Sequence, residues 1–275
     1  MIPNLPTLRI LPLDSLILHE DHDLQRTLPL VEKLRSQGIL RNPPIVMPLR
    51  DGSNRYMVLD GANRVTSLRV MEFPHIVAQV VEPDDPRVTL QTWNHVIWGM
   101  KPATLLRLLK QIEGLSLKKI EVQHSFTPPD CTTLQVRLAD GRAYLGCTPA
   151  GLDEEMRVLH AIVNTYKERA FLDRTSQTLV ESFRPVYPDL TGLVIFPRFD
   201  IQTVLNLAGR GQILPSGITR FTVSPRVLHL NYPLHELSSA KPLEYKQEYL
   251  QHWIEERLKN KNVRYYAEAT FLFDE

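Results

Sequence analysis

Residues 55–69 read RYMVLDGANRVTSLR, and this stretch decides the expected fold of the N-terminal part of the chain. Apolar residues up to position 59 predict a strand, Asp60-Gly61 interrupts the pattern, and the apolar spacing that follows predicts a helix. The first N–H groups of a helix lack intrahelical partners and carry the positive end of its dipole. A strand that runs into a helix in this way therefore predicts an anion site.

The residues of this turn suit a phosphate group. Gly61 allows a phosphate to approach the backbone closely, and Arg64 can add a forked cationic contact. Asp60, at the end of the strand, can hold a magnesium ion or orient a hydroxyl group. The alternative is an ordinary turn in which Asp60 is the N-cap of the helix, and the stretch itself leaves both interpretations open.

Strands and helices continue on both sides of this stretch. Asp-Gly-Ser-Asn at 51–54 predicts a hairpin, and the segment Pro83-Asp84-Asp85-Pro86 is typical of a domain boundary. A second Asp-Gly turn predicts a hairpin of residues 132–138 and 142–146. Beyond the boundary, we also expect helices at 101–113, 152–166 and 244–259, a helix capped by Asp200, and strands at 193–196 and 263–273. The pattern predicts an α+β protein with a small N-terminal domain, residues 1–90, and a larger mixed α/β C-terminal domain, residues 91–275.

The composition argues against several classes of protein. With 32 Lys and Arg against 31 Asp and Glu, the net charge is +1, so the chain lacks the basic surplus of a dedicated DNA-binding protein, although a local basic patch is still allowed. No run of about 18 apolar residues occurs and no signal-peptide pattern opens the sequence, so we expect no membrane partner. Two cysteines cannot build a disulfide framework, and we expect a cytoplasmic protein.

Three further stretches carry residue types that can serve a site. Residues 19–23, His-Glu-Asp-His-Asp, are a metal site or a solvated loop, and Glu20 is a candidate general base. Trp93 is a core residue or part of a binding site. Residues 215–221, PSGITRF, place hydroxyl side chains next to Arg220, which suits a carboxylate or phosphate, or else form an exposed turn.

The strand–Asp-Gly-x-x-Arg–helix unit at 60–64 resembles the ParB/sulfiredoxin-like superfamily. The whole chain is more closely similar to the free L-serine kinase family, including its members from siderophore-biosynthesis clusters. That similarity is carried by His19-Glu20, RYMVLDGANRVTSLRVMEFPHI at 55–76, Thr92-Trp93, and IFPRFDIQTVLNLAGRGQILPSGITRF at 195–221.

The resemblance implies a fold and an activity. It implies a ParB/sulfiredoxin-like nucleotide- and phosphate-binding domain at residues 1–90 and an α+β domain at residues 91–275 that completes the substrate site. The activity would be transfer of a phosphoryl group from ATP or ADP, with Mg²⁺, to the hydroxyl of free L-serine, giving O-phospho-L-serine. In siderophore clusters that product feeds the synthesis of 2,3-diaminopropionate.

The resemblance also assigns roles to single positions. Carried over by position, Glu20 would be the base for the serine hydroxyl, and Asp60 would lie beside that hydroxyl and the metal. The phosphate cradle would include Gly61, Asn63 and Arg64. Serine binding would involve Trp93, Thr219 and Arg220.

One position departs from the family pattern. The family usually has a histidine immediately before the arginine, where this chain has Asn63. Asparagine can donate a neutral hydrogen bond to a phosphate oxygen, but it cannot supply imidazolium charge or shuttle a proton. A second class of function therefore stays open, a non-catalytic nucleotide-binding regulatory protein such as a ParB-like transcription or partition factor. Glu20 and Thr219-Arg220 favour the enzyme, because a nucleotide switch needs neither.

Overall fold

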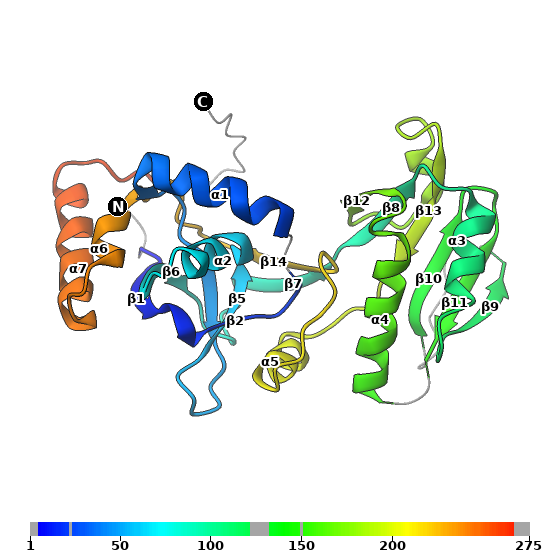
Figure 1. Cartoon of the computed structure of the whole chain (residues 1–275), viewed down its shortest axis with the longest axis horizontal. Coiled ribbons are helices and arrows are strands. Elements are labelled where there is room, and N and C mark those ends of the chain that lie inside the picture. Colours follow the sequence, from blue (N-terminus) through cyan, green and yellow to red (C-terminus); the bar gives the residue numbers. More distant parts are fainter. Residues whose placement is uncertain (1–4, 22–23, 122–131, 149–150, 267–275) are drawn as a thin grey trace. The chain divides into compact units, whose positions relative to one another are not determined.

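The computed structural model of the chain describes residues 5–21, 24–121, 132–148 and 151–266 (Figure 1). Contacts between residues divide the chain into two compact units. Unit 1 consists of Met1–Ile17, Asp23–Arg87 and Val223–Glu275, and unit 2 consists of Leu18–His22 and Val88–Thr222. Helices and several sheets occur together, so the α+β class expected from the sequence is confirmed. The bounds of the two expected domains stay a prediction.

A five-stranded sheet forms the centre of unit 1, in the order β1-β6-β4-β5-β2. Its strands are β1 (Thr7–Pro12), β2 (Leu16–Leu18), β4 (Ile45–Pro48), β5 (Tyr56–Asp60) and β6 (His75–Val80). Strands β4 and β5 are antiparallel and form the hairpin expected around residues 51–54, whereas β4 and β6 are parallel. Two short strands, β3 (Ile39–Leu40) and β15 (Tyr232–Pro233), pair with each other and bring the last segment of unit 1 to the second.

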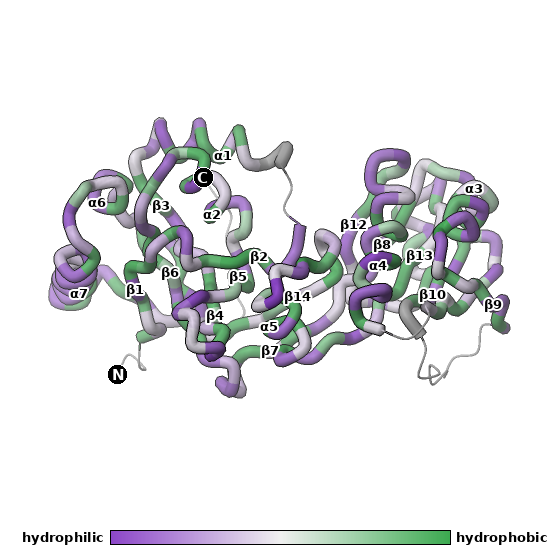
Figure 2. Tube along the Cα trace, turned by 60° about the horizontal axis from the view of Figure 1, so that its bottom comes forward, coloured by the Kyte–Doolittle hydropathy of each residue, from purple (hydrophilic) through white to green (hydrophobic). Residues whose placement is uncertain are grey.

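Four helices belong to unit 1 within the described residues. They are α1 (Leu24–Gln37), α2 (Ala62–Val70), α6 (Leu234–Ser238) and α7 (Leu243–Lys259), and a short 3-10 helix, η1 (Leu13–Ser15), follows β1. Helices α1 and α2 pack against each other, and α7 packs against β1, where Gln247 accepts a hydrogen bond of 2.8 Å from the N–H of Ile10. Figure 2 shows hydrophobic residues along β4, β5 and β6, as burial on both faces of a sheet requires.

Unit 2 is built on a six-stranded antiparallel sheet, in the order β12-β8-β13-β10-β11-β9. Its strands are β8 (Asn94–Trp98), β9 (Ser116–Ile120), β10 (Thr132–Leu138), β11 (Ala143–Cys147), β12 (Phe171–Thr175) and β13 (Leu190–Ile195). Strands β10 and β11 form the second expected hairpin. A separate pair of strands, β7 (Val88–Thr92) and β14 (Thr219–Val223), carries residues that the sequence singled out.

The helices of unit 2 agree with the apolar spacing of the sequence. They are α3 (Pro102–Leu109), α4 (Leu152–Tyr166), α5 (Ile201–Gly209) and the 3-10 helix η2 (Val180–Phe183). Helix α4 buries Met156, Leu159 and Val163 on one face, which the 3.6-residue period predicts. Asp200 caps α5 as expected, because its Oδ1 accepts a hydrogen bond of 2.8 Å from the N–H of Thr203.

The end of the chain differs from the expectation. The strand predicted at 263–273 is absent from residues 263–266, which have no regular structure, and positions 267–273 lie outside the described residues. Within the described part, no helix is both long and apolar enough to span a bilayer.

Candidate active site

The predicted site residues, apart from Asn63, lie in two clusters, one in each unit, and each cluster also includes a residue that was not predicted. The Asp60 cluster, in unit 1, consists of Asp60, Gly61, Arg64 and Arg226. The Glu20 cluster, in unit 2, consists of Glu20, Trp93, Gly217, Thr219 and Arg220.

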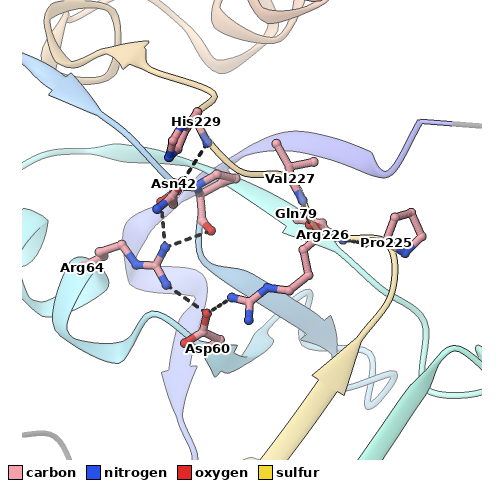
Figure 3. Close-up of polar contacts among 9 residues, drawn as sticks. Asn42, Asp60, Arg64, Gln79, Pro225, Arg226, Val227 and His229 are labelled. Carbon is pink, nitrogen blue, oxygen red and sulfur yellow. Dashed lines mark hydrogen bonds and ion pairs between the residues drawn. The ribbon is translucent and has the colours of Figure 1, made fainter. Parts of the chain in front are cut away.

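Asp60 lies at the end of β5 between two guanidinium groups (Figure 3). Its Oδ2 accepts a hydrogen bond of 3.1 Å from Arg64 Nη2 and a second one from Arg226 Nη2. Burial alone would raise the pKa of Asp60, but the positive charges of Arg64 and Arg226 outweigh it and hold the pKa below its usual value. Asp60 is therefore a carboxylate at neutral pH.

Gly61, and not Asp60, is the N-cap of α2, so the interpretation of this stretch as a turn capped by Asp60 is wrong. Gly61 has φ +100°, a conformation that side chains of L-residues rarely adopt, and an added Cβ would lie 2.8 Å from Pro44 Cβ. Because glycine has no side chain, the N-cap residue supplies no hydrogen-bond acceptor to the first N–H groups of α2. These N–H groups retain the capacity to bind an anion.

Arg64 links α2 to the loop before β4. Its Nη1 donates to the backbone oxygens of Asn42, at 2.9 Å, and Pro43, at 3.3 Å, while its Nη2 binds Asp60. The side chain is 20% exposed, whereas that of Arg226 is 43% exposed. Arg64 therefore stabilises the turn through contacts within the protein. Arg226 is the more exposed of the two cations and so has more surface for contact with a ligand.

Arg226 is a site residue that sequence reasoning missed. It lies 166 positions from Asp60, in a loop whose sequence carries no periodic pattern. Gln79, buried on β6, holds this loop in place: its Nε2 donates to the Pro225 oxygen and its Oε1 accepts from the Val227 N–H, both at 2.9 Å (Figure 3). A glutamine between apolar residues of a predicted strand was the available signal, because such a side chain needs polar partners when it is buried.

Asn63 lies in the first turn of α2, next to the predicted phosphate site. Its Oδ1 is buried and makes no hydrogen bond within the part of the chain that the structure describes, and the same holds for Thr66 Oγ1 on the following turn. A phosphate only accepts hydrogen bonds, so it would bind the amide nitrogen of Asn63 and not Oδ1. Rotation of the side-chain amide by 180° would exchange the positions of these two atoms.

In unit 2, the carboxylate of Glu20 is held by the segment before and at the start of β14. Its Oε2 accepts a hydrogen bond of 2.9 Å from the N–H of Gly217, and its Oε1 accepts one of 2.6 Å from the N–H of Thr219. The Thr219 hydroxyl also donates to Oε1. Oε1 is thus bound twice and Oε2 once, which leaves Oε2 the capacity to accept a further hydrogen.

The neighbours of Glu20 are ordered as well. His19 is buried, and its Nε2 lies 2.8 Å from Thr219 Oγ1, whose proton is directed at Glu20. Nε2 must therefore carry the hydrogen of this contact. The N–H of Asp21 donates to the oxygen of Leu214, and the N–H of Leu214 donates to the oxygen of His19. This part of the stretch is therefore not a solvated loop.

The metal-site interpretation of residues 19–23 finds no support in the part that is described. Positions 22 and 23 lie outside the described residues. Among the residues that the structure covers, no group of three or more His, Cys, Asp or Glu side chains is arranged to hold a metal ion.

Trp93 and Arg220 form a stacked pair at the segment whose N–H groups bind this carboxylate. The guanidinium carbon of Arg220 lies 4.4 Å from the centroid of the Trp93 ring, a cation–π contact, and both side chains are half-buried. The N–H of Trp93 donates to the oxygen of Ile218 at 3.0 Å. The exposed-turn interpretation of residues 215–221 is therefore wrong, and Arg220 is a cation held against Trp93 on the segment that binds the Glu20 carboxylate.

The sequence comparisons find kinases among the relatives. The chain matches no protein-family model. It is 23% identical over 279 residues to the ATP-dependent L-serine kinase SbnI of Staphylococcus aureus, covering 98% of this chain and 97% of SbnI. An ATP-dependent L-serine kinase of Staphylothermus marinus is 30% identical over 112 residues, covering 40% of this chain and 42% of that protein.

Solved structures share the fold. The structure of C-terminally truncated SbnI from Staphylococcus aureus matches with a TM-score of 0.72 at 21% identity, covering 91% of this chain and 97% of that one. A free serine kinase in complex with AMP matches with a TM-score of 0.67 at 17% identity, covering 86% and 98%.

Proposed function

The chain is a near full-length homologue of SbnI and the free serine kinases, and from this premise we propose that it phosphorylates free L-serine. The reaction transfers the γ-phosphoryl group of ATP to the serine hydroxyl and yields O-phospho-L-serine and ADP. The O–H bond of serine breaks, a new O–P bond forms, and the bond between the β and γ phosphates of ATP breaks.

The observation that carries this proposal is the geometry of the Glu20 cluster. Glu20 has an oxygen, Oε2, with room for one more hydrogen, and so can accept the proton of a hydroxyl nucleophile. Arg220, fixed on the Trp93 ring, is a cation for the carboxylate of a free amino acid. A base and a carboxylate-binding cation in one cluster match a small substrate that carries both a hydroxyl and a carboxylate.

We assign the nucleotide phosphates to the Asp60 cluster. The N–H groups at the start of α2 and the guanidinium of Arg226 supply donors and positive charge, and Gly61 permits close approach to the backbone. Phosphoryl transfer depends mainly on such positioning and on stabilisation of charge on the transferred group. The five-stranded sheet with its β5–Gly61–α2 turn also supports a ParB/sulfiredoxin-like assignment of this part of the chain.

Mg²⁺ enters the proposal with the nucleotide. Magnesium is commonly bound by one or two carboxylates together with substrate phosphates and water. Asp60 is the carboxylate that the chain would add, and its two arginine partners mean that the phosphates would supply most of the ligands. The ion would neutralise charge on the phosphates.

The test is to incubate the protein with L-serine, Mg²⁺ and either ATP or ADP, and to measure O-phosphoserine by mass spectrometry. We expect product with ATP. Replacing Glu20→Gln should lower turnover by about 10²- to 10⁴-fold, as is typical when a general base is removed, while nucleotide affinity stays within about twofold.

Asp21→Asn is the matched control, because it neutralises the adjacent carboxylate, which faces His160 at 3.4 Å. We expect this variant to keep turnover close to that of the parent. Full turnover in the Glu20→Gln protein would remove Glu20 from the role of base. No product with either nucleotide, together with tight nucleotide binding, would instead support the regulatory alternative that Asn63 favours.

A further inference from the structure

His95 is a fully buried side chain in β8 that none of the roles above includes. Its imidazole is 0% exposed, and both ring nitrogens have partners. Nε2 lies 2.9 Å from the backbone oxygen of Gly217, and Nδ1 lies 2.8 Å from the hydroxyl of Tyr166 on α4. A carbonyl oxygen only accepts, so Nε2 carries the hydrogen, and Nδ1 of the neutral ring accepts from Tyr166.

The partner of His95 is the glycine that binds the proposed base. The N–H of Gly217 donates to Glu20 Oε2, and its oxygen accepts from His95. The next oxygen along the chain, that of Ile218, accepts from the N–H of Trp93. His95 and the N–H of Trp93 therefore bind two consecutive carbonyl oxygens. The N–H groups of Gly217 and Thr219 in the same segment donate to the carboxylate of Glu20.

Gly217 does not hold this segment in place by itself if the contact with His95 is lost. Its φ is +79°, and glycine adopts positive and negative φ about equally readily, so the orientation of the backbone here depends on its hydrogen bonds. The peptide that carries the Gly217 oxygen joins the two peptides whose N–H groups bind Glu20, so a change in its orientation would displace these N–H groups relative to the carboxylate. A base displaced by about 1 Å can lose about a hundredfold in rate.

We propose that His95 is a positioning residue for phosphoryl transfer, which acts through the Gly217 carbonyl to hold the Gly217–Thr219 segment and thereby orient Glu20. This inference rests on the proposed function for its kinetic consequence. The simpler view is that His95 only fills the core of unit 2. The two views predict different results for polar substitutions that differ in whether the side chain is long enough to contact the Gly217 oxygen.

The test compares His95→Gln with His95→Asn. Both side chains are neutral amides, but a glutamine amide reaches the position of Nε2, whereas an asparagine amide reaches only that of Nδ1. We expect His95→Asn to lower kcat for O-phosphoserine formation by about 10- to 100-fold, with the KM for ATP within about twofold, and His95→Gln to retain kcat within about threefold.

Two controls separate positioning from stability. In a Glu20→Gln background, His95→Asn should change the residual rate by less than about twofold, because the oriented group is already absent. Val96→Ala removes buried volume from the same strand without touching the turn, so it should lower Tm but leave kcat unchanged. An Asn variant as fast as the parent, or a rate that follows Tm across all three variants, would overturn the inference.

Hydrogen exchange gives a readout that does not depend on serine phosphorylation. The amide hydrogens of Gly217 and Thr219 should exchange at least about tenfold faster in His95→Asn than in the parent or in His95→Gln. If the parent phosphorylates no serine, the proposed function fails, yet this exchange pattern would still support the anchoring by His95. Equal protection in all three proteins would overturn it.

Discussion

Arg220 is the residue to which we assign binding of the serine carboxylate. Its guanidinium is already held against Trp93, so little side-chain freedom is lost when it binds a carboxylate. Replacing Arg220→Ala removes a charge-assisted contact of roughly 1.5–3 kcal/mol, which corresponds to an increase of about ten- to over a hundredfold in the serine KM. The ATP KM should change far less, and steady-state kinetics with each substrate varied in turn measures both.

Arg169→Ala removes an exposed arginine of the same unit and serves as the matched control. It should leave both KM values unchanged. A serine KM that is the same in the Arg220→Ala protein as in the parent would show that another group binds the carboxylate.

Asn63 is the position where the chain departs from the family pattern, and its Oδ1 has no hydrogen-bond partner among the residues that the structure describes. A histidine at the start of α2 would point an imidazolium toward transferring phosphate, where its charge is most useful as negative charge shifts in the transition state. We expect Asn63→His to fold and to hold or raise kcat at saturating serine and ATP. A well-folded histidine variant much slower than an active parent would show that Asn63 has a catalytic role of its own.

At the level of elements, the junction of β5 and α2 depends on the missing side chain at Gly61. In Gly61→Ala, the methyl group would lie 2.8 Å from Pro44 Cβ and 2.9 Å from Arg64 Nη2, and φ +100° adds strain of about 1–2 kcal/mol. The start of α2 must shift, so we expect weaker binding of ATP by calorimetry together with a lower Tm.

Gly52→Ala separates these two effects. Gly52 has φ +81°, but nothing lies within 4 Å of its Cβ position, so this variant carries backbone strain without the clash. It should lower Tm and leave ATP affinity unchanged. Equal ATP affinity in the Gly61→Ala protein would contradict the assignment of the phosphates to this turn.

The junction at Asp60 and Gly61 was predictable because strand, turn and helix follow one another within 15 residues of sequence, 55–69, and each has a local signal. The amphipathic helix α4 was predictable for the same reason. The distant residues that contact these elements could not be predicted from the sequence. Arg226 reaches Asp60, and the N–H of Gly217 reaches Glu20, across 166 and 197 positions, and no local pattern encodes such contacts.

The stability of the whole molecule should depend on pH through His95. Burial is the main cause that lowers the pKa of His95 from 6.5 to about 4. Between these values the unfolded chain binds a proton that the folded chain does not, so the free energy of unfolding falls as the pH falls from about 6.5 to about 4. The loss amounts to about 3 kcal/mol over the window, and it should be absent from His95→Gln.

Urea unfolding of both proteins at pH 7, 6, 5 and 4.5 measures this dependence, and the quantity of interest is the difference between the two proteins, because other groups titrate equally in both. Parallel pH dependences in the parent and His95→Gln would mean that the imidazole is not kept neutral by burial.

The division of the chain into two interleaved units was the feature that the sequence indicated least clearly. The segment Pro83–Pro86 lies beside the point where unit 1 gives way to unit 2, at Arg87 and Val88, and its prolines mark that point locally. The return of the chain to unit 1 at Val223 has no comparable signal, because it is determined by the contacts of Gln79 and of β3 with distant residues.

This interleaving of segments allows the usual order of folding during synthesis to be reversed. Domains generally fold as they are synthesised, with the N-terminal one first. Here every segment of unit 2 has been translated once Thr222 is made, whereas unit 1 still awaits Arg226, β15 and α7. The unit that carries the Glu20 cluster can therefore be complete while the nascent N-terminal sheet still lacks α7, and the first residues to be translated would then be among the last to reach their final environment.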